Sequence, residues 1–304
     1  MRFPLKRHFR AIALIGAATL ALAACTNASD TGANSASFDP NAVAKDDSLA
    51  SQIPAAIRAK GTLVVGSDTS FAPSEFLGGP DNQTPMGYDV DLAKAIAATL
   101  GLKADVQTSS FASILPALGP KYDLGISNFV ITSERLKAVN MVAYGTASSA
   151  WAVQTGNPKN FSIEDVCGRK VGVQTGSIQA DDVAGLSTKC VQSGKAPVEV
   201  IALDKQTDVN TRLVNGALDA MDSASDVVGY AIQQAHGGIE KLGDTYDSAP
   251  QGIAIAKDDT AFADLIQKVV AKLMADGTYK KILATWNVSD IGITTPELNP
   301  RLAS

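Results

Sequence analysis

A single arginine near the middle of the chain carries a charge whose position needs an explanation. The segment YDLGISNFVITSERLKAVN, residues 122–140, reads as a strand followed by a helix. Thr132 is a favourable helix N-cap, and Glu134 in the first turn suits the helix dipole. Arg135 lies in the same turn, where a positive charge is disfavoured. Either Arg135 is a solvated surface residue, or its guanidinium and the free N–H groups of the helix start bind an anion such as a carboxylate.

The composition narrows the chemistry open to the other residues. The 304 residues are enough for one large domain or two lobes, and 45% hydrophobic with 19% charged residues is typical of soluble globular proteins. A net charge of −5 gives no reason to expect nucleic acid or an anionic membrane surface as a partner. The two histidines are His8 and His236, and the sequence has no G-x-S-x-G, Walker, HExxH or CxxC motif. We therefore expect that the protein is not an enzyme and that it binds neither a cofactor nor a metal.

Residues 1–25 indicate a leader that is removed. MRFPLKRHFR is a positively charged n-region, and AIALIGAATLALA is an apolar stretch too short to span a bilayer. The following LAAC, Leu22 to Cys25, resembles the lipobox of bacterial lipoproteins, in which the cysteine becomes the lipidated first residue. The alternative is an ordinary secretory signal with a chance cysteine.

The next residues, 26–50, are small and polar and predict a flexible tether. We therefore expect an extracytoplasmic protein that contacts the cell membrane only through a lipid anchor.

Besides Cys25, two cysteines remain, Cys167 and Cys190. In an exported protein an even pair suggests a disulfide bond, and two cysteines with one histidine cannot complete a zinc site. We predict a structural disulfide.

From residue 61 onward, strand and helix patterns alternate. Examples are TLVVGSD followed by GYDVDLAKAIAATLGL, and KVGVQTG followed later by PVEVIAL and TDVNTRLVNGAL. This alternation is typical of α/β folds built on parallel strands. We predict two α/β lobes, with lobe 1 formed by residues 51–147 and 249–304 and lobe 2, residues 148–248, inserted into it.

Six segments, in order, resemble the amino-acid-type family (family 3) of extracellular solute-binding proteins of ABC importers. They are GTLVVGSDTSFAPSEF, GYDVDLAKAIAATLGL, SSFASILPAL, YDLGISNFVITSERLKAV, VGVQTGSIQ and ADGTYKKILATW. The cysteine pair and the DSAPQG segment resemble the actinobacterial branch. The resemblance implies a periplasmic-binding-protein-like type II fold, a Venus flytrap whose two lobes are joined by a two-crossover hinge.

The resemblance also implies a function. The expected protein is a monomer that captures an amino acid or a related small carboxylate between its lobes and delivers it to the permease of an ABC importer. One alternative is a surface ligand sensor without an importer. Another is a dehydratase-like enzyme on the same fold, for which Asp68 and Glu75 are the obvious candidate acid pair.

The resemblance assigns expected roles to ten residues. Arg135 matches the arginine that grips the ligand carboxylate, and Asn128 and Val130 match the strand edge beside it. Ser177 and Ile178 match the start of a helix that meets the same carboxylate. The side-chain pocket is expected to be lined by Asp68 with Phe71 and Phe111. The last two, Asp222 and Ala224, belong to the strand that normally supplies an aspartate for the ligand ammonium.

The sequence departs from the family pattern where that ammonium is bound. Val130 stands where a hydroxyl residue is usual, and Ala224 stands where the aspartate is usual. Losing one partner of a buried charge pair costs about 3–5 kcal/mol. Three explanations stay open: the ligand lacks an α-ammonium, Asp222 or Asp226 replaces the missing partner, or the protein has little ligand affinity.

Overall fold

The computed structural model of the protein describes residues 38–302. The leader, Cys25 and the first part of the expected tether lie outside these residues. Within residues 38–302, none of the helices combines the length and apolar character needed to cross a membrane.

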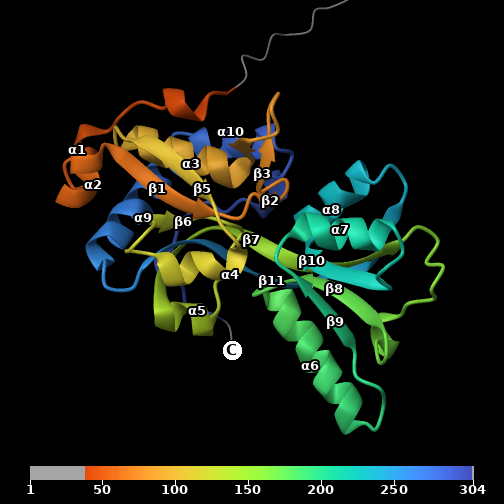
Figure 1. Ribbon diagram of the computed structural model, residues 1–304. Helices are drawn as coiled ribbons and strands as arrows, with labels where there is room; N and C mark the ends of the chain where they lie inside the picture. Colours follow the sequence, from red (N-terminus) through yellow and green to blue (C-terminus); the bar gives the residue numbers. More distant parts are fainter. Residues whose placement is uncertain (1–37, 303–304) are drawn as a thin grey trace, which may run out of the picture. The chain divides into compact units, whose positions relative to one another are not determined.

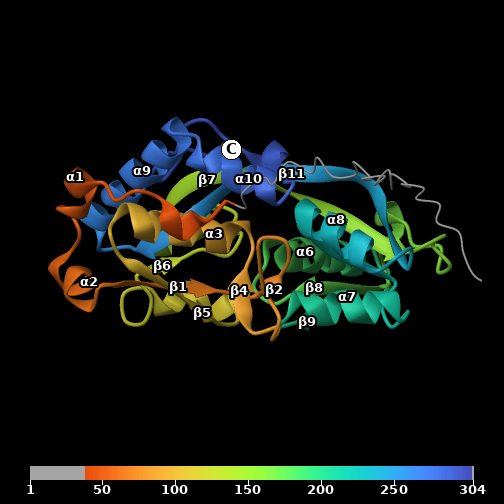
Figure 2. The ribbon, with the colours of Figure 1, turned by 90° about the horizontal axis from the view of Figure 1, so that it is seen from above.

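Helices and strands fall into two groups joined by two long strands, as Figures 1 and 2 show. Lobe 1 holds α1 (Asp47–Ala50), α2 (Ala55–Lys60), β1 (Thr62–Ser67), β2 (Ser70–Phe71), β3 (Glu75–Gly78), β4 (Thr84–Met86), α3 (Tyr88–Thr99), β5 (Lys103–Thr108), α4 (Phe111–Ile114), β6 (Leu124–Gly125), α5 (Ser133–Ala138), α9 (Thr260–Ala275) and α10 (Thr278–Thr285). Lobe 2 holds β8 (Lys170–Gln174), α6 (Ile178–Gln192), β9 (Glu199–Leu203), α7 (Gln206–Val214), β10 (Ala220–Ala224) and α8 (Ser225–Gln234). The connecting strands are β7 (Val139–Gln154) and β11 (Ile239–Ala256). Short 3-10 turns lie at Pro40–Ala42, Leu115–Ala117, Ile163–Asp165 and Ser289–Ile291.

One eight-stranded sheet runs through both lobes in the order β5-β1-β6-β11-β7-β10-β8-β9. The pairs β5–β1–β6 and β10–β8–β9 are parallel, as the alternating pattern predicted, whereas β7 and β11 are antiparallel to each other and to their neighbours. The expected α/β fold is confirmed.

The middle parts of β7 and β11 are the two crossovers that connect the lobes, here called the passage between the lobes. Their pairing is irregular between Leu242 and Gly252, with register shifts on either side of Tyr246 and Ala249. Such irregularities bend and twist a strand pair. The boundaries expected from the sequence, after residues 147 and 248, fall within this stretch of the two strands.

Each lobe has its own apolar cores on the sheet. In lobe 1, α3, α9 and α10 pack on one face through buried residues such as Ile96, Phe262 and Ile282. In lobe 2, α6 covers one face, and α7 and α8 cover the other. These cores hold the starts of α5, α6 and α8 in fixed places beside the passage.

Residues 38–50 correct the predicted tether. Asp46 caps α1 by accepting hydrogen bonds from the N–H groups of Ser48 and Leu49. Leu49 and Ala50 are buried in the core of lobe 1, and Phe38 packs against it. Although this segment is polar on average, its few apolar side chains are spaced to meet the lobe. Its residues therefore belong to the fold.

The predicted disulfide is confirmed. Cys190 near the end of α6 is bonded to Cys167, with a Cα–Cα distance of 5.6 Å. The bond closes a loop with a sequence separation of 23 residues. Closing a loop of this size stabilises a protein by roughly 3 kcal/mol on the chain-entropy model.

Candidate ligand-binding site

Arg135 is positioned by the start of α5. The Thr132 hydroxyl caps this helix and accepts the Arg135 N–H at 3.1 Å, as predicted. The guanidinium turns back and donates to the Val130 carbonyl at 2.7 Å and, across the lobes, to the Gly176 carbonyl at 3.2 Å. Its carbon lies 5.4 Å from the centre of the Phe111 ring. Burial lowers the pKa of Arg135 to about 10, so the side chain remains a cation at neutral pH.

The start of α6 faces Arg135 from lobe 2. Ser177 is the N-cap, and its hydroxyl accepts the N–H of Ala180 at 3.1 Å. Gly176 has a φ of +80°, and a Cβ there would lie 3.0 Å from the Cβ of Ala112 in α4. The close approach of the lobes at this turn therefore favours glycine.

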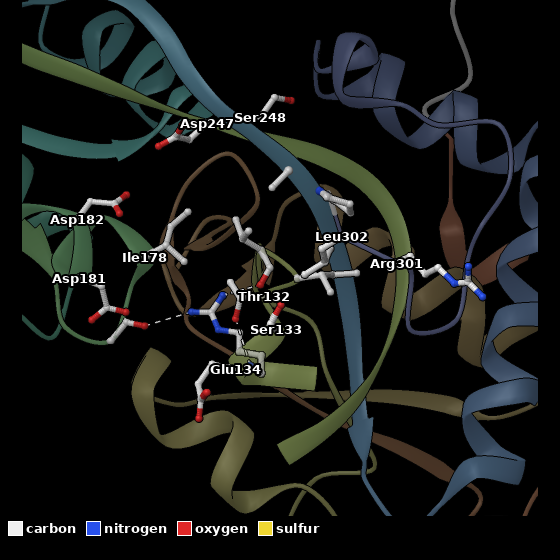
Figure 3. A pocket seen from close by; sticks show the side chains of 16 residues that line it. Thr132, Ser133, Glu134, Ile178, Asp181, Asp182, Asp247, Ser248, Arg301 and Leu302 are labelled. Carbon is white, nitrogen blue, oxygen red and sulfur yellow. Dashed lines mark hydrogen bonds between the residues drawn. The ribbon is translucent and has the colours of Figure 1, made fainter. Parts of the chain in front are cut away.

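A cavity of about 800 Å³ lies beside Arg135. Figure 3 shows Thr132 and Ser133 at the start of α5, Asp181 and Asp182 on the side of α6, and Asp247 on β11. Besides Arg135, the charged residues that line it are Glu134, Asp181, Asp182, Asp247 and Arg301. Four acidic and two basic side chains therefore line the cavity, so its wall is acidic on balance although it includes the cations Arg135 and Arg301.

Asp68 directly follows β1 and lines a different cavity from the one beside Arg135. It is buried, and one oxygen accepts from the hydroxyl and the N–H of Ser70 at 2.6 and 3.1 Å. The other accepts from the Phe111 N–H at 3.0 Å and, across the lobes, from Gln174 Nε2 at 2.9 Å. Burial raises the pKa of Asp68. Asp68, with Lys205 and Tyr230, lines a cavity of about 660 Å³.

Both predicted aromatic residues are buried at the meeting of the lobes. Phe111 packs on Phe129 with ring centres 4.7 Å apart. Phe71 packs against Ala224 and Val227 of lobe 2. Ala224, one of the two positions that lack an ammonium partner, thus lies in an apolar cluster with Phe71, whereas Val130 is buried and lines the cavity beside Arg135.

Asn128 is hydrogen-bonded to buried polar residues of lobe 1. Its φ of +47° is left-handed, a conformation that asparagine tolerates better than most residues. Its N–H donates to Asp89 at 2.8 Å, and its amide nitrogen donates to the hydroxyls of Ser74 and Tyr88 at 2.8 and 2.9 Å. The amide oxygen is buried without a partner among the described residues.

Asp222 is not among the residues that line either of these cavities. It is paired in register with Trp151, and one carboxyl oxygen accepts a short hydrogen bond from the Tyr246 hydroxyl. The other oxygen is buried without a partner among residues 38–302. Burial, with Asp182 and Asp247 nearby, raises the pKa of Asp222 to about 8. A carboxyl that holds its proton at neutral pH is poorly suited to attract an ammonium group.

The acid pair considered for an enzyme does not meet in a cavity. Glu75 is fully buried and accepts from the Ser127 hydroxyl at 2.7 Å, and the same hydroxyl accepts from the Asp68 N–H. Burial and the neighbouring Asp89 raise the pKa of Glu75 well above its ordinary range. Through the Ser127 hydroxyl, Glu75 is linked by hydrogen bonds to the backbone N–H of Asp68.

Two contributors were not predicted from the sequence: the amide of Gln174 donates to Asp68, and the N–H of Gln206 donates to the Ser70 hydroxyl at 3.1 Å. Asp226, which was considered as a partner for the ligand ammonium, accepts hydrogen bonds from lobe 1. Gln174 ends a buried strand, and a polar residue at the end of an apolar run was the available signal. Nothing in the sequence pattern indicated Gln206.

Of the ten predicted ligand-binding residues, Val130, Arg135 and Ile178 line the first cavity and Asp68 lines the second. The others, Phe71, Phe111, Asn128, Ser177, Asp222 and Ala224, are not among the residues lining these two cavities.

The fold has two α/β lobes, and Arg135 of lobe 1 faces the start of α6 in lobe 2. This is the architecture of a receptor that binds its ligand between two lobes. The comparison with known families agrees: residues 63–289 match the bacterial extracellular solute-binding proteins, family 3, and the chain belongs to this family.

The chain is also similar to individual proteins of known sequence or structure. The chain is 30% identical to the arginine-binding protein ArgT of Corynebacterium glutamicum over 297 residues, which cover 95% of each chain. It superposes with a TM-score of 0.68 and 34% identity on an ancestral arginine-binding protein bound to arginine, covering 74% of this chain and 98% of that one.

A third similar structure is the ancestral amino acid-binding protein AncCDT-1, a precursor of cyclohexadienyl dehydratase. Its TM-score is 0.67 at 29% identity, over 76% of this chain and 97% of that one. These proteins are binding proteins, and the third has an enzyme among its descendants. The chain is thus a solute-binding protein of the ABC transporter type.

Proposed function

We propose that the protein captures a small carboxylate that carries a second, cationic group, with an arginine-type amino acid as the first candidate. The observation that carries this proposal is a pair of opposite charges on either side of Phe111. Arg135 lies over the Phe111 ring, and Asp68 accepts the Phe111 N–H. Neither side chain forms an ion pair within residues 38–302.

Each end of such a ligand has a matching group. The ligand carboxylate pairs with the guanidinium of Arg135, as a bidentate pair, near the N-terminus of α6. The distal cation pairs with Asp68, between the aromatic side chains of Phe71 and Phe111, whose faces favour a cation. The acidic wall of the larger cavity and the names of the arginine-binding relatives support the same ligand class.

The α-ammonium of the ligand has no side-chain partner at Val130 or Ala224. The proposal therefore requires the carboxylate and the distal cation and leaves the α-ammonium as the variable to be measured. Asp222, bonded to Tyr246 beneath α6, is a weaker candidate partner than the sequence suggested.

Thermal unfolding of the purified protein with three matched ligands tests this assignment. L-Arginine has all three groups, L-citrulline lacks the side-chain charge, and δ-guanidinovalerate lacks the α-ammonium. A ligand at a hundred times its dissociation constant stabilises by roughly 2.7 kcal/mol.

We expect L-arginine and δ-guanidinovalerate to raise the unfolding midpoint and L-citrulline to raise it much less. An equal shift with L-citrulline would remove Asp68 from cation recognition. A shift with L-arginine alone would mean that another group pairs with the α-ammonium.

We further propose that the protein is monomeric, is held on the outer side of the cell membrane by a lipid on Cys25, and delivers its ligand to an importer permease. The leader pattern and the family's extracellular character support this location. We expect the Cys25→Ser variant to leave the membrane fraction and appear in the surrounding medium. Retention of this variant on the membrane, judged by immunoblotting of the two fractions, would exclude the anchor.

We infer a receptor role linked to transport, rather than a sensor or a dehydratase, because the relatives are named as binding proteins and Glu75 lies under the site and not in it.

A further inference from the structure

One carboxylate of lobe 2 is hydrogen-bonded to three groups of lobe 1. Asp226, the second residue of α8, accepts on a single oxygen from the Tyr88 hydroxyl at 2.9 Å, from the Ser74 hydroxyl at 3.2 Å and from the Asn128 amide at 3.3 Å. Asp226 forms no ion pair among the described residues, so hydrogen bonds from lobe 1 and from the first N–H groups of its own helix stabilise its charge. Burial raises its pKa, while the bond from Tyr88 opposes that rise.

The groups that Asp226 contacts are tied to both connecting strands. The Tyr88 hydroxyl accepts at 3.2 Å from the amide of Gln251 in β11, and this amide also donates to the Tyr144 hydroxyl of β7 at 2.6 Å. Tyr144 donates to Asp89, which accepts the Asn128 N–H. These bonds form a closed ring from Asn128 through Asp226 and the two connecting strands back to Asn128.

The ring lies next to the place where the sequence lacks an ammonium partner. Ala224 precedes Asp226 by two residues and contacts Phe71, so no lobe 2 carboxylate stands at that position. The nearby carboxylate of Asp226 is directed to the hydroxyls and the amide of lobe 1 instead.

We propose that Asp226 is a positioning residue that joins the lobes through protein groups alone, so that closure does not depend on an ammonium group of the ligand. The proposal rests on the proposed function in one respect, that the ligand is held between the lobes. It explains why Val130 and Ala224 can be apolar in a protein that retains Arg135 for the carboxylate.

The proposal has a quantitative consequence for specificity. If only the closed form holds the ligand, the apparent dissociation constant equals the intrinsic constant divided by the closed fraction. Removing Asp226 lowers the closed fraction and must weaken every ligand by the same factor. A direct bond between Asp226 and the ligand ammonium would instead weaken only ligands that carry this group.

The first measurement is the distance between the lobes without ligand. Spin labels on cysteines introduced as Lys103→Cys in lobe 1 and Thr211→Cys in lobe 2 report this distance by pulsed electron resonance. We expect a major short-distance population in the otherwise unchanged protein and a shift to longer distances in Asp226→Ala. An identical distance distribution in Asp226→Ala would overturn the proposal.

The second measurement is the affinity for L-arginine and for δ-guanidinovalerate by calorimetry. We expect Asp226→Ala to weaken both by the same factor, about tenfold. A loss confined to L-arginine would assign Asp226 to the ligand ammonium and refute the proposed role. If the unchanged protein binds neither compound, the proposed function fails, while the distance measurement still decides the role of Asp226.

Two further variants separate the bond from general effects on the fold. Asp208→Ala removes another first-turn aspartate of a lobe 2 helix, one that is exposed, and should change neither distance nor affinity. Tyr88→Phe removes the nearest lobe 1 donor and should open the lobes as Asp226→Ala does. Because both changes break one interaction, their combined effect should be smaller than the sum of the single effects. Additive effects would contradict the proposal.

Discussion

Replacing Arg135 by methionine is expected to lower the affinity for L-arginine by roughly two to four decades. The ligand carboxylate would lose its charged partner, which costs about 3–5 kcal/mol at a buried site, and one decade of affinity corresponds to about 1.4 kcal/mol. Methionine keeps most of the side-chain length, so the contacts with Phe111 and Phe129 can persist. Titration calorimetry measures the change.

The control for this variant is Arg212→Met. Arg212 is exposed in the last turn of α7 and should leave the affinity unchanged. Both variants should keep the circular dichroism spectrum of the unchanged protein. If Arg135→Met binds L-arginine as tightly as the unchanged protein does, the carboxylate is bound elsewhere, and the sequence argument from the helix start is wrong.

Replacing Asp222 by asparagine is expected to remove a pH-dependent loss of stability. The folded protein raises the pKa of Asp222 from 3.8 to about 8, chiefly by burial. Between these two values the folded state binds more protons than the unfolded state, so the free energy of unfolding falls as the pH rises. One pKa unit corresponds to about 1.4 kcal/mol, so the loss across this range is at most about 6 kcal/mol.

Asparagine has no such titration and can still accept the hydrogen bond from Tyr246. We therefore expect Asp222→Asn to gain stability over the unchanged protein as the pH is raised from about 4 to about 8. Urea unfolding at both ends of this range provides the comparison. The exposed carboxylate of Asp105 supplies the control, Asp105→Asn. A constant difference between Asp222→Asn and the unchanged protein at all pH values would show that Asp222 is not buried in its neutral form.

The helices and parallel strands were largely predictable because their local signals agree with the fold. Periodic apolar residues define α3, and Gly277, with a φ of +81°, separates α9 from α10. The lengths of β7 and β11 were not predictable. Their long antiparallel pairing joins residues about a hundred positions apart, and no local pattern encodes such a pairing.

The site was predictable in its charged residue and not in its partners. Arg135 stood out because its charge conflicts with its place in a helix, and the cap at Thr132 is present as predicted. Asp222 was predicted as a ligand-binding residue because it lies on the strand that normally supplies the aspartate for the ligand ammonium. Its carboxyl instead accepts a hydrogen bond from the hydroxyl of Tyr246 in β11. The residue pattern of β10 alone could not predict a contact with another strand. The bonds of Asp226 to lobe 1 likewise depend on how the lobes meet.

Both ends of the described chain are bonded to the same lobe. The Asp46 N–H donates to the Thr99 carbonyl at 2.8 Å, and the Asn299 N–H donates to the Met141 carbonyl at 2.7 Å. Lobe 2 has only β7 and β11 as covalent links. Anything attached beyond either end of the described residues is therefore held by lobe 1, and opening of the lobes would move lobe 2 relative to that attachment. A fluorescent protein fused at a terminus would report little of this motion, whereas a dye on α7 paired with one on β5 would follow it directly.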